Sequence, residues 1–309
     1  MRANNFDGLR LAGAFGVLWS HMYLLTGRVE PLTPIGGNYG DISVLMFFSI
    51  SGYLVSLSWQ RDPDAGRFLA RRALRILPGV AVALLLAYGA VGLLGLSGFP
   101  RNPFTQLNEP LWTIPLETYC YILLAGFLIA ARRAGPWMAL LMFGGLAVTR
   151  EVGFYAPLFS YGLLFAIGVL VAEFRLLERP VAILLMVVVA SGFMFTQHPY
   201  MVRALLLPLA AIYIGTRSWP IMRSAGKFGD LSYGIYIYAW PVQQVAVAFL
   251  PGASLPLLLL ISVPVIVLLA WLSWRYVEKP ALALKPRLAA SGRTGRPDLP
   301  VAAQRDPSS

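Results

Sequence analysis

The sequence predicts an all-α polytopic membrane protein with about ten transmembrane helices and both termini in the cytoplasm. Hydrophobic residues make up 58% of the 309 residues, charged residues only 13%, and the mean hydropathy is +0.67. A soluble domain carries about twice that charged fraction. Long apolar runs recur from end to end. Helices are the elements that satisfy their own backbone hydrogen bonds in lipid, so the runs predict membrane-spanning helices.

Polar breaks divide the chain into these spans. The predicted spans cover residues 7–26, 40–59, 76–97, 110–131, 136–149, 156–174, 180–197, 200–217, 229–250 and 255–275. Segment 136–149 is short for a crossing, and a tilted or re-entrant path is the alternative. From Lys285 the chain is rich in Pro, Ala, Ser, Gly and Arg. We therefore expect an integral membrane domain over 1–284 and a disordered cytoplasmic tail over 285–309.

Positive charge is distributed unevenly across these spans. The formal net charge is +11. If the N-terminus is inside, the 25 basic residues all fall on one side except Arg28, Arg101, Arg150 and Arg203. The positive-inside rule places that side in the cytoplasm. The excess of basic over acidic residues therefore reflects membrane topology, and it does not indicate a nucleic-acid partner.

The first span contains two ionisable side chains, Arg10 near its start and His21 near its end. An ionisable group inside a membrane helix marks a candidate functional site. Eleven residues make about three helical turns, so Arg10 and His21 share one face about 16 Å apart. This spacing predicts an anion site at the water boundary and acid–base chemistry deeper in the membrane.

Glu117 is the other ionisable residue well inside a span. Counted along the helices, His21 lies about 21 Å from the inner boundary and Glu117 about 10 Å from the outer boundary of a core about 30 Å thick. Both therefore fall in the outer half. A carboxylate beside an imidazole fixes its tautomer and raises its basicity. We expect one joint site, and the alternative is two separate polar pockets.

Two residues that precede Glu117 in the chain, Thr113 and Pro115, bear on the shape of its segment. Thr113 shares its face because four residues separate them. Pro115 removes a helical hydrogen bond, which predicts a kink just above Glu117. That kink either shapes a substrate cavity or serves packing alone.

Arg72 and Arg75 lie at the cytoplasmic start of the third span, three residues apart and therefore on one helical face. Guanidinium forks match phosphate oxygens. From composition alone, anchoring at the cytoplasmic interface or contact with anionic lipid is the favoured alternative.

Two further segments combine small or aromatic residues. Ser51 lies among small residues between aromatic ones in 47–53, which predicts close helix packing. Tyr233, Tyr236 and Trp240 form a stripe at i, i+3 and i+7, and their polar groups need partners in lipid. Packing is favoured here over a ligand surface.

Taken in order, six segments resemble the membrane-bound acyltransferase family 3, the bacterial polysaccharide and lipid O-acyltransferases. They are 6–10 with His21, 47–53, Arg72 to Arg75, 111–117, 231–236 and 275–280. The resemblance covers the chain to about residue 282, and its weight comes from all six segments occurring in order.

The resemblance implies transfer of an acyl group, usually acetyl, from acyl-CoA to a hydroxyl of a cell-surface or lipid-linked glycan at the bacterial inner membrane. His21 matches the family's essential histidine, as general base or transient acyl carrier, and we expect Glu117 to orient it. Arg72 and Arg75 match a pair implicated in handling the donor, and we expect Arg10 to join them. The residues expected to shape the site are Asp7, Ser51, Trp112, Thr113, Tyr233, Tyr236 and Trp240. No metal or bound cofactor is implied.

This chain also departs from the family pattern. Many members carry a histidine just before Trp240-Pro241, where this chain has Ala239, so the acid–base role falls on His21 alone. Some members also carry a fused extracytoplasmic hydrolase-like domain, and we expect this chain to finish the transfer with its membrane domain or with a separate partner. Two other functions stay open: a proton-coupled glycolipid transporter or flippase, and a non-catalytic partner in glycan assembly.

Overall fold

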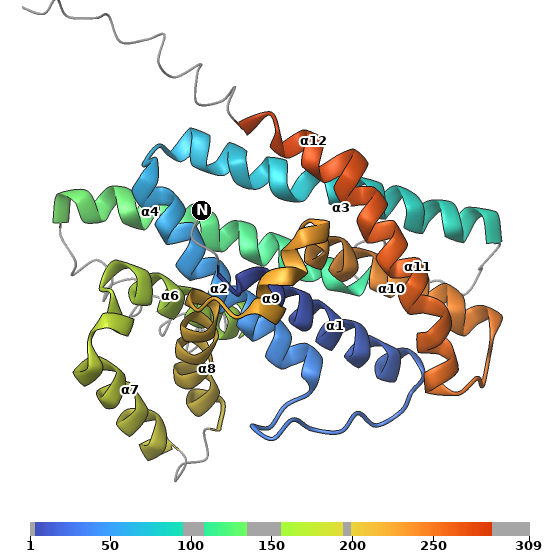
Figure 1. Ribbon diagram of the computed structural model, residues 1–309, viewed down its shortest axis with the longest axis horizontal. Coiled ribbons are helices and arrows are strands. Elements are labelled where there is room, and N and C mark those ends of the chain that lie inside the picture. Colours follow the sequence, from blue (N-terminus) through green and yellow to red (C-terminus); the bar gives the residue numbers. More distant parts are fainter. Residues whose placement is uncertain (1–3, 95–107, 135–155, 194–198, 286–309) are drawn as a thin grey trace, which may run out of the picture.

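The computed structural model describes residues 4–94, 108–134, 156–193 and 199–285, and every regular element in these ranges is helical (Figure 1). The predicted all-helical class is confirmed for this part of the chain. The predicted span 136–149 and nearly all of the predicted tail, 286–309, lie outside the described residues.

A helix stands at the position of every other predicted span. The elements are α1 (Phe6–Leu25), α2 (Tyr39–Arg61), α3 (Ala65–Leu94), η1 (Glu109–Trp112), α4 (Thr113–Ala134), α6 (Ala156–Glu173), η2 (Leu176–Glu178), α7 (Pro180–Phe193), α8 (Pro199–Thr216), α9 (Pro220–Ser224), η3 (Ala225–Phe228), α10 (Leu231–Phe249), α11 (Leu255–Ser273), η4 (Trp274–Glu278) and α12 (Lys279–Leu282).

Within the described ranges, four helical segments are long and apolar enough to cross a membrane, and a bent pair formed by α8 and the α9–η3 segment would make five. The four are Tyr39–Arg61, Ala65–Ala90, Glu109–Ala130 and Leu255–Leu282. The chain is therefore a membrane all-α protein, while the count of ten and the side of the termini stay predictions. The helices α1 and α10 are not among these candidate membrane spans. Both carry polar side chains, such as His21 on α1 and Gln243 on α10.

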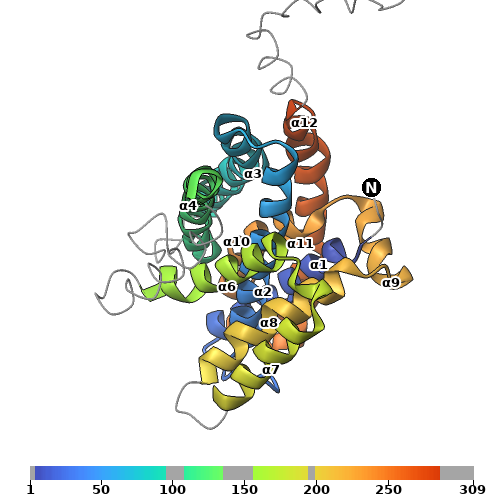
Figure 2. The same cartoon turned by 90° about the vertical axis from the view of Figure 1, so that its left-hand side faces the viewer.

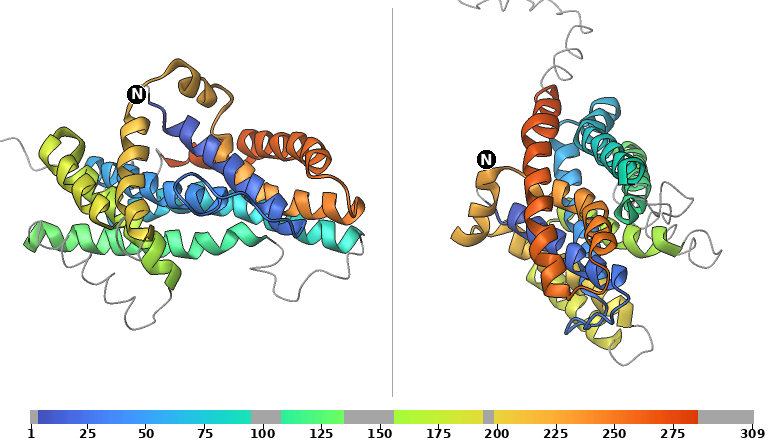
Figure 3. Two further views of the ribbon diagram at one scale, coloured as in Figure 1. Left: turned by 90° about the horizontal axis from the view of Figure 1, so that it is seen from below. Right: turned by 90° about the vertical axis from the view of Figure 1, so that its right-hand side faces the viewer.

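The helix α2 occupies the centre of the bundle. It packs along α6 on one side and α1 on the other, and α1 in turn packs on α10, which lies against α11. Figures 2 and 3 show α3, α4 and α12 together on one side of this core, and α7 with α8 on the opposite side. Helices from the first and last thirds of the chain therefore enclose the polar face of α1.

Two glycines let α2 and α6 approach closely. Gly52 of α2 faces the backbone of Phe165, and Gly168 of α6 faces the backbone of Ser49. A Cβ atom at either position would overlap that backbone. The packing role predicted for the 47–53 segment is confirmed, because small residues permit such approaches between membrane helices.

The structure corrects the expected start of one helix and an expected kink in another. The helix α3 begins at Ala65 instead of residue 76, because Arg, Leu and Ala extend a helix beyond its apolar run. Asp64 caps it by accepting the backbone N–H of Arg67 at 2.8 Å. The predicted kink at Pro115 is wrong, because α4 begins at Thr113. Proline in a first turn removes no helical hydrogen bond.

Candidate functional site

Two cavities lie along the polar face of α1. The first, here called the arginine cavity, measures about 140 Å³ and is lined by Arg10, Arg72, Arg75 and Glu117 among others. The second, here called the vestibule, measures about 410 Å³ and contains His21. The three predicted donor-binding arginines therefore share one cavity, and His21 lies in another.

Asp230 joins two of these arginines. The Arg75 guanidinium forms an ion pair and hydrogen bond with Asp230, and Arg10 Nη1 lies 3.8 Å from the same carboxylate. Arg10 Nη1 also lies 3.7 Å from Asp7 Oδ1, so the predicted site-shaping Asp7 orients it. Sequence reasoning missed Asp230. Its signal is an acidic residue at the N-terminal end of an apolar span, where the helix dipole favours negative charge.

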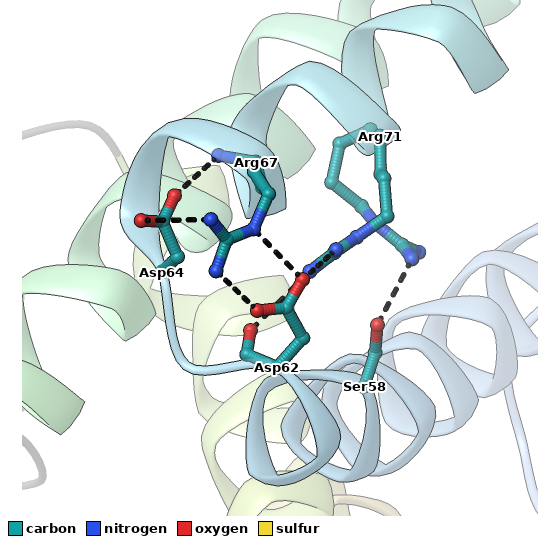
Figure 4. Close-up of polar contacts among 6 residues, drawn as sticks. Ser58, Asp62, Asp64, Arg67 and Arg71 are labelled. Carbon is teal, nitrogen blue, oxygen red and sulfur yellow. Dashed lines mark hydrogen bonds and ion pairs between the residues drawn. The ribbon is translucent and has the colours of Figure 1, made fainter. Parts of the chain in front are cut away.

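Arg72 differs from the arginines that precede it on α3. Arg67 and Arg71 both bind Asp62 (Figure 4), and their hydrogen bonds hold the pKa of Asp62 well below its usual range. Arg72 forms no ion pair with the described residues; its Nη2 lies 3.5 Å from Ser58 Oγ, and its buried Nε has no partner. Among the three arginines that line the cavity, Arg72 is therefore the one that no carboxylate of the described residues pairs with.

Lys285 adds a further positive charge near these arginines. It follows α12, which packs on α3. Burial, together with repulsion from Arg72, Arg75 and Arg71, lowers the pKa of Lys285 to about 8. Arg72, which no carboxylate of the described residues pairs with, and Lys285 thus place positive charge at this end of the arginine cavity, which favours an anionic ligand.

Glu117 is held in the arginine cavity. Its carboxylate accepts a hydrogen bond from Ser51 at 3.2 Å and another from the Tyr121 hydroxyl. The expected contact with His21 is not made, because the two residues line different cavities. Similar depth fixes only one coordinate, and helix packing sets the lateral position. Tyr121 was missed, although its i+4 spacing from Glu117 is the signal that could have found it.

In the vestibule, His21 packs edge-on against Trp240, with ring centroids 4.9 Å apart and an interplanar angle of 83°. Its Nδ1 atom is buried and has no hydrogen-bond partner among the described residues. A buried imidazole nitrogen without a partner costs free energy unless a ligand or water satisfies it. The structure thus presents His21 as a group available to a bound molecule.

Tyr236 and Val44 line both cavities, so they mark where the two meet. The hydroxyl groups of Tyr236 and Thr113 lie 2.9 Å apart, and Phe47 packs edge-on against the Tyr236 ring. Of the other residues expected to shape the site, Tyr233 lines the arginine cavity and donates to the Ile76 carbonyl at 2.7 Å. Trp112 lines the vestibule.

A family model described as an acyltransferase domain, that of acyltransferase family 3, matches residues 4–275. The chain belongs to this family. The resemblance found from the sequence is thereby confirmed, and the chain is an acyltransferase of the membrane. The residues that line the two cavities all lie within the matched range.

Two relatives resemble this acyltransferase over most of its length. The O-acetyl transferase of Shigella phage Sf6 is 33% identical over 90% of this chain and 96% of that protein. Nodulation protein 10 of Rhizobium leguminosarum bv. viciae is 28% identical over 93% of this chain and 95% of that protein. No solved structure matches the chain.

Proposed function

We propose that this acyltransferase moves an acetyl group from acetyl-CoA to a hydroxyl of a cell-surface or lipid-linked glycan. The observation that carries the proposal is the pair of cavities that meet at Tyr236, one lined by arginines and the other by His21. The similarity to an O-acetyl transferase supports acetyl as the group and a hydroxyl as its acceptor.

The arginine cavity suits the donor. Coenzyme A carries phosphates, and guanidinium groups bind phosphate through paired, charge-assisted hydrogen bonds. Arg72 has the free donors for this contact, while Arg10 and Arg75 add charge and are held in place by Asp230. In this proposal the phosphates stay near α3 and the pantetheine arm carries the thioester toward Tyr236.

The role proposed for Glu117 follows from its contacts. It does not touch His21, so it acts as a positioning residue on the donor side. By accepting from Ser51 and Tyr121 it fixes the wall between α2 and α4. Its charge also stabilises the buried cation of Arg72 across the cavity.

His21 carries the acid–base step. In one route it takes the proton of the acceptor hydroxyl while the oxygen attacks the thioester carbonyl. A C–O bond forms, the C–S bond breaks, and the proton passes to the departing CoA thiolate. In the other route an imidazole nitrogen first takes the acetyl group, releases CoA thiol, and then passes the group to the hydroxyl.

The test uses the full chain in nanodiscs with radiolabelled acetyl-CoA and glycan extracted from the host. Wild type is expected to label the glycan, and His21→Ala is expected to lose transfer while keeping its insertion and acetyl-CoA binding. His198→Ala, which removes the chain's other histidine, is the matched control and should retain activity. Normal glycan labelling by His21→Ala would refute the proposed role.

A second incubation without acceptor distinguishes the two routes. Label that remains on wild-type protein but not on His21→Ala indicates an acyl carrier. Absence of protein label, with transfer intact once glycan is added, indicates a general base.

A further inference from the structure

The vestibule has a lining that the transfer step alone does not require. Besides His21, it is lined by Trp112 and Tyr161, whose rings pack edge-on against each other with centroids 5.2 Å apart and an interplanar angle of 61°. The Tyr161 hydroxyl donates to Asp41 Oδ1 at 3.1 Å. Aromatic surfaces beside fixed hydrogen-bond acceptors give a pocket that holds a ligand with one apolar face and several hydroxyl groups.

Three carboxylates contribute to the polar part of this lining, those of Glu30, Asp41 and Glu109. Glu30 accepts from the Ser20 hydroxyl and from the backbone N–H of Tyr39 at 3.0 Å, which holds the α1–α2 connection against the end of α1. The side-chain carboxylate of Glu109, on η1, forms no hydrogen bond or ion pair with the described residues. An ionised carboxylate accepts hydrogen bonds and donates none, so these groups suit hydroxyl donors.

The positive charge of the vestibule is small. Arg28 is the one arginine or lysine among its described lining residues, and its Nη2 donates to the Ala253 carbonyl at 3.0 Å. Arg203 approaches the same connection at Gly37 but does not line the vestibule. Three carboxylates, those of Glu30, Asp41 and Glu109, stand against this one arginine in the lining, so acidic side chains outnumber basic ones there.

An independent feature points to a bound molecule in this space. The buried Nδ1 of His21 has no partner among the described residues, and His21 lines the vestibule together with these aromatic and acidic groups. A ligand hydroxyl hydrogen-bonded to the imidazole would satisfy it.

We propose that the vestibule is the acceptor subsite and that it selects a sugar without negative charge. This inference rests on the proposed function, and it adds the class of acceptor. The sugar ring packs on Trp112 and Tyr161, its hydroxyl groups donate to Glu109 and Asp41, and one hydroxyl reaches His21. A uronic acid or phosphorylated sugar is disfavoured because like charges brought together at an interface repel.

The test compares trimers of galactose and of galacturonic acid, whose rings differ in the carboxylate at C6. The full chain in nanodiscs receives saturating radiolabelled acetyl-CoA, and kcat/KM is measured for each trimer. Wild type is expected to favour the galactose trimer by about tenfold or more. Equal or better use of the galacturonic acid trimer would overturn the proposal.

Charge reversal at Glu109 localises the effect. In Glu109→Lys the preference for the neutral trimer should shrink at least about tenfold, with KM for acetyl-CoA unchanged. Glu178→Lys is the matched control, because Glu178 is exposed on η2 and paired with Arg175 at 3.8 Å, away from the vestibule lining. An unchanged preference in Glu109→Lys would count against the subsite.

The remaining outcomes separate this inference from the proposed function. Transfer to host glycan but to neither trimer overturns the neutral-sugar subsite and leaves the proposed function standing. Transfer to no acceptor at all, host glycan included, overturns both.

Discussion

The hydroxyl groups of Thr113 and Tyr236 lie 2.9 Å apart, and this hydrogen bond joins the start of α4 to α10 beside the junction of the two cavities. The Tyr236 hydroxyl also lies 3.1 Å from the Pro110 carbonyl. A side chain fixed in this way limits passage between the arginine cavity and the vestibule. In the proposed reaction it keeps water on the acceptor side away from the thioester.

Removing the Tyr236 side chain should therefore uncouple donor cleavage from transfer. Tyr236→Ala is expected to raise CoA release without acceptor and to lower the share of acetyl groups that reach glycan. Tyr236→Phe keeps the ring and loses only the hydroxyl contacts, worth about 1 kcal/mol of stability. It should stay close to wild type in this ratio. Thiol release and labelled glycan measured in parallel check both, and tight coupling in Tyr236→Ala would contradict this function of the ring.

Arg72 should dominate donor affinity. Arg72→Ala is expected to raise the dissociation constant for acetyl-CoA about tenfold or more, because a charge-assisted contact to phosphate is lost. Arg67→Ala serves as the control, since Arg67 binds Asp62 and Asp64 and does not line the cavity. Equilibrium binding in nanodiscs checks this. Equal effects of the two substitutions would show that general surface charge, and not the cavity, sets affinity.

The positions of His21 and Glu117 show which spatial relationships can be predicted from the sequence. Helical spacing could relate Arg10 to His21, because both residues lie on the single helix α1. Depth counting could not place Glu117 laterally. Its partner Ser51 is 66 residues away in the chain, and this contact depends on how α2 packs on α4.

Arg72 and Arg75 likewise show that contacts within one helix can be predicted from the sequence, whereas contacts between distant segments cannot. The spacing of Arg72 and Arg75 predicted a shared face, and both line one cavity. What separates them energetically is Asp230, which pairs with Arg75 across 155 residues and forms no ion pair with Arg72. No local pattern encodes that pairing, so the sequence alone treated the two residues as equivalent.

Substitution of Gly52 tests the close approach of α2 and α6. Gly52→Ala should destabilise the protein by about 1–3 kcal/mol, because the added Cβ overlaps the Phe165 backbone. Gly126→Ala on α4 is the matched control: a Cβ there meets nothing within 4 Å, and alanine favours a helix by about 0.5–1 kcal/mol. Thermal unfolding in detergent checks the opposite signs. A stable Gly52→Ala variant would show that the two helices separate without cost.

Donor affinity should fall as the pH rises through about 8, the pKa to which burial and the neighbouring arginines lower Lys285. Below this pH the ammonium group is charged and attracts phosphate, whereas above it the neutral amine does not. The CoA phosphates are already ionised above pH 7, since their second pKa lies near 6. Coenzyme A binding to His21→Ala between pH 7 and 9 isolates this titration from catalysis. Lys285→Arg should bind equally well across the range, because arginine stays protonated. A pH dependence that persists in Lys285→Arg would assign the titration to another group.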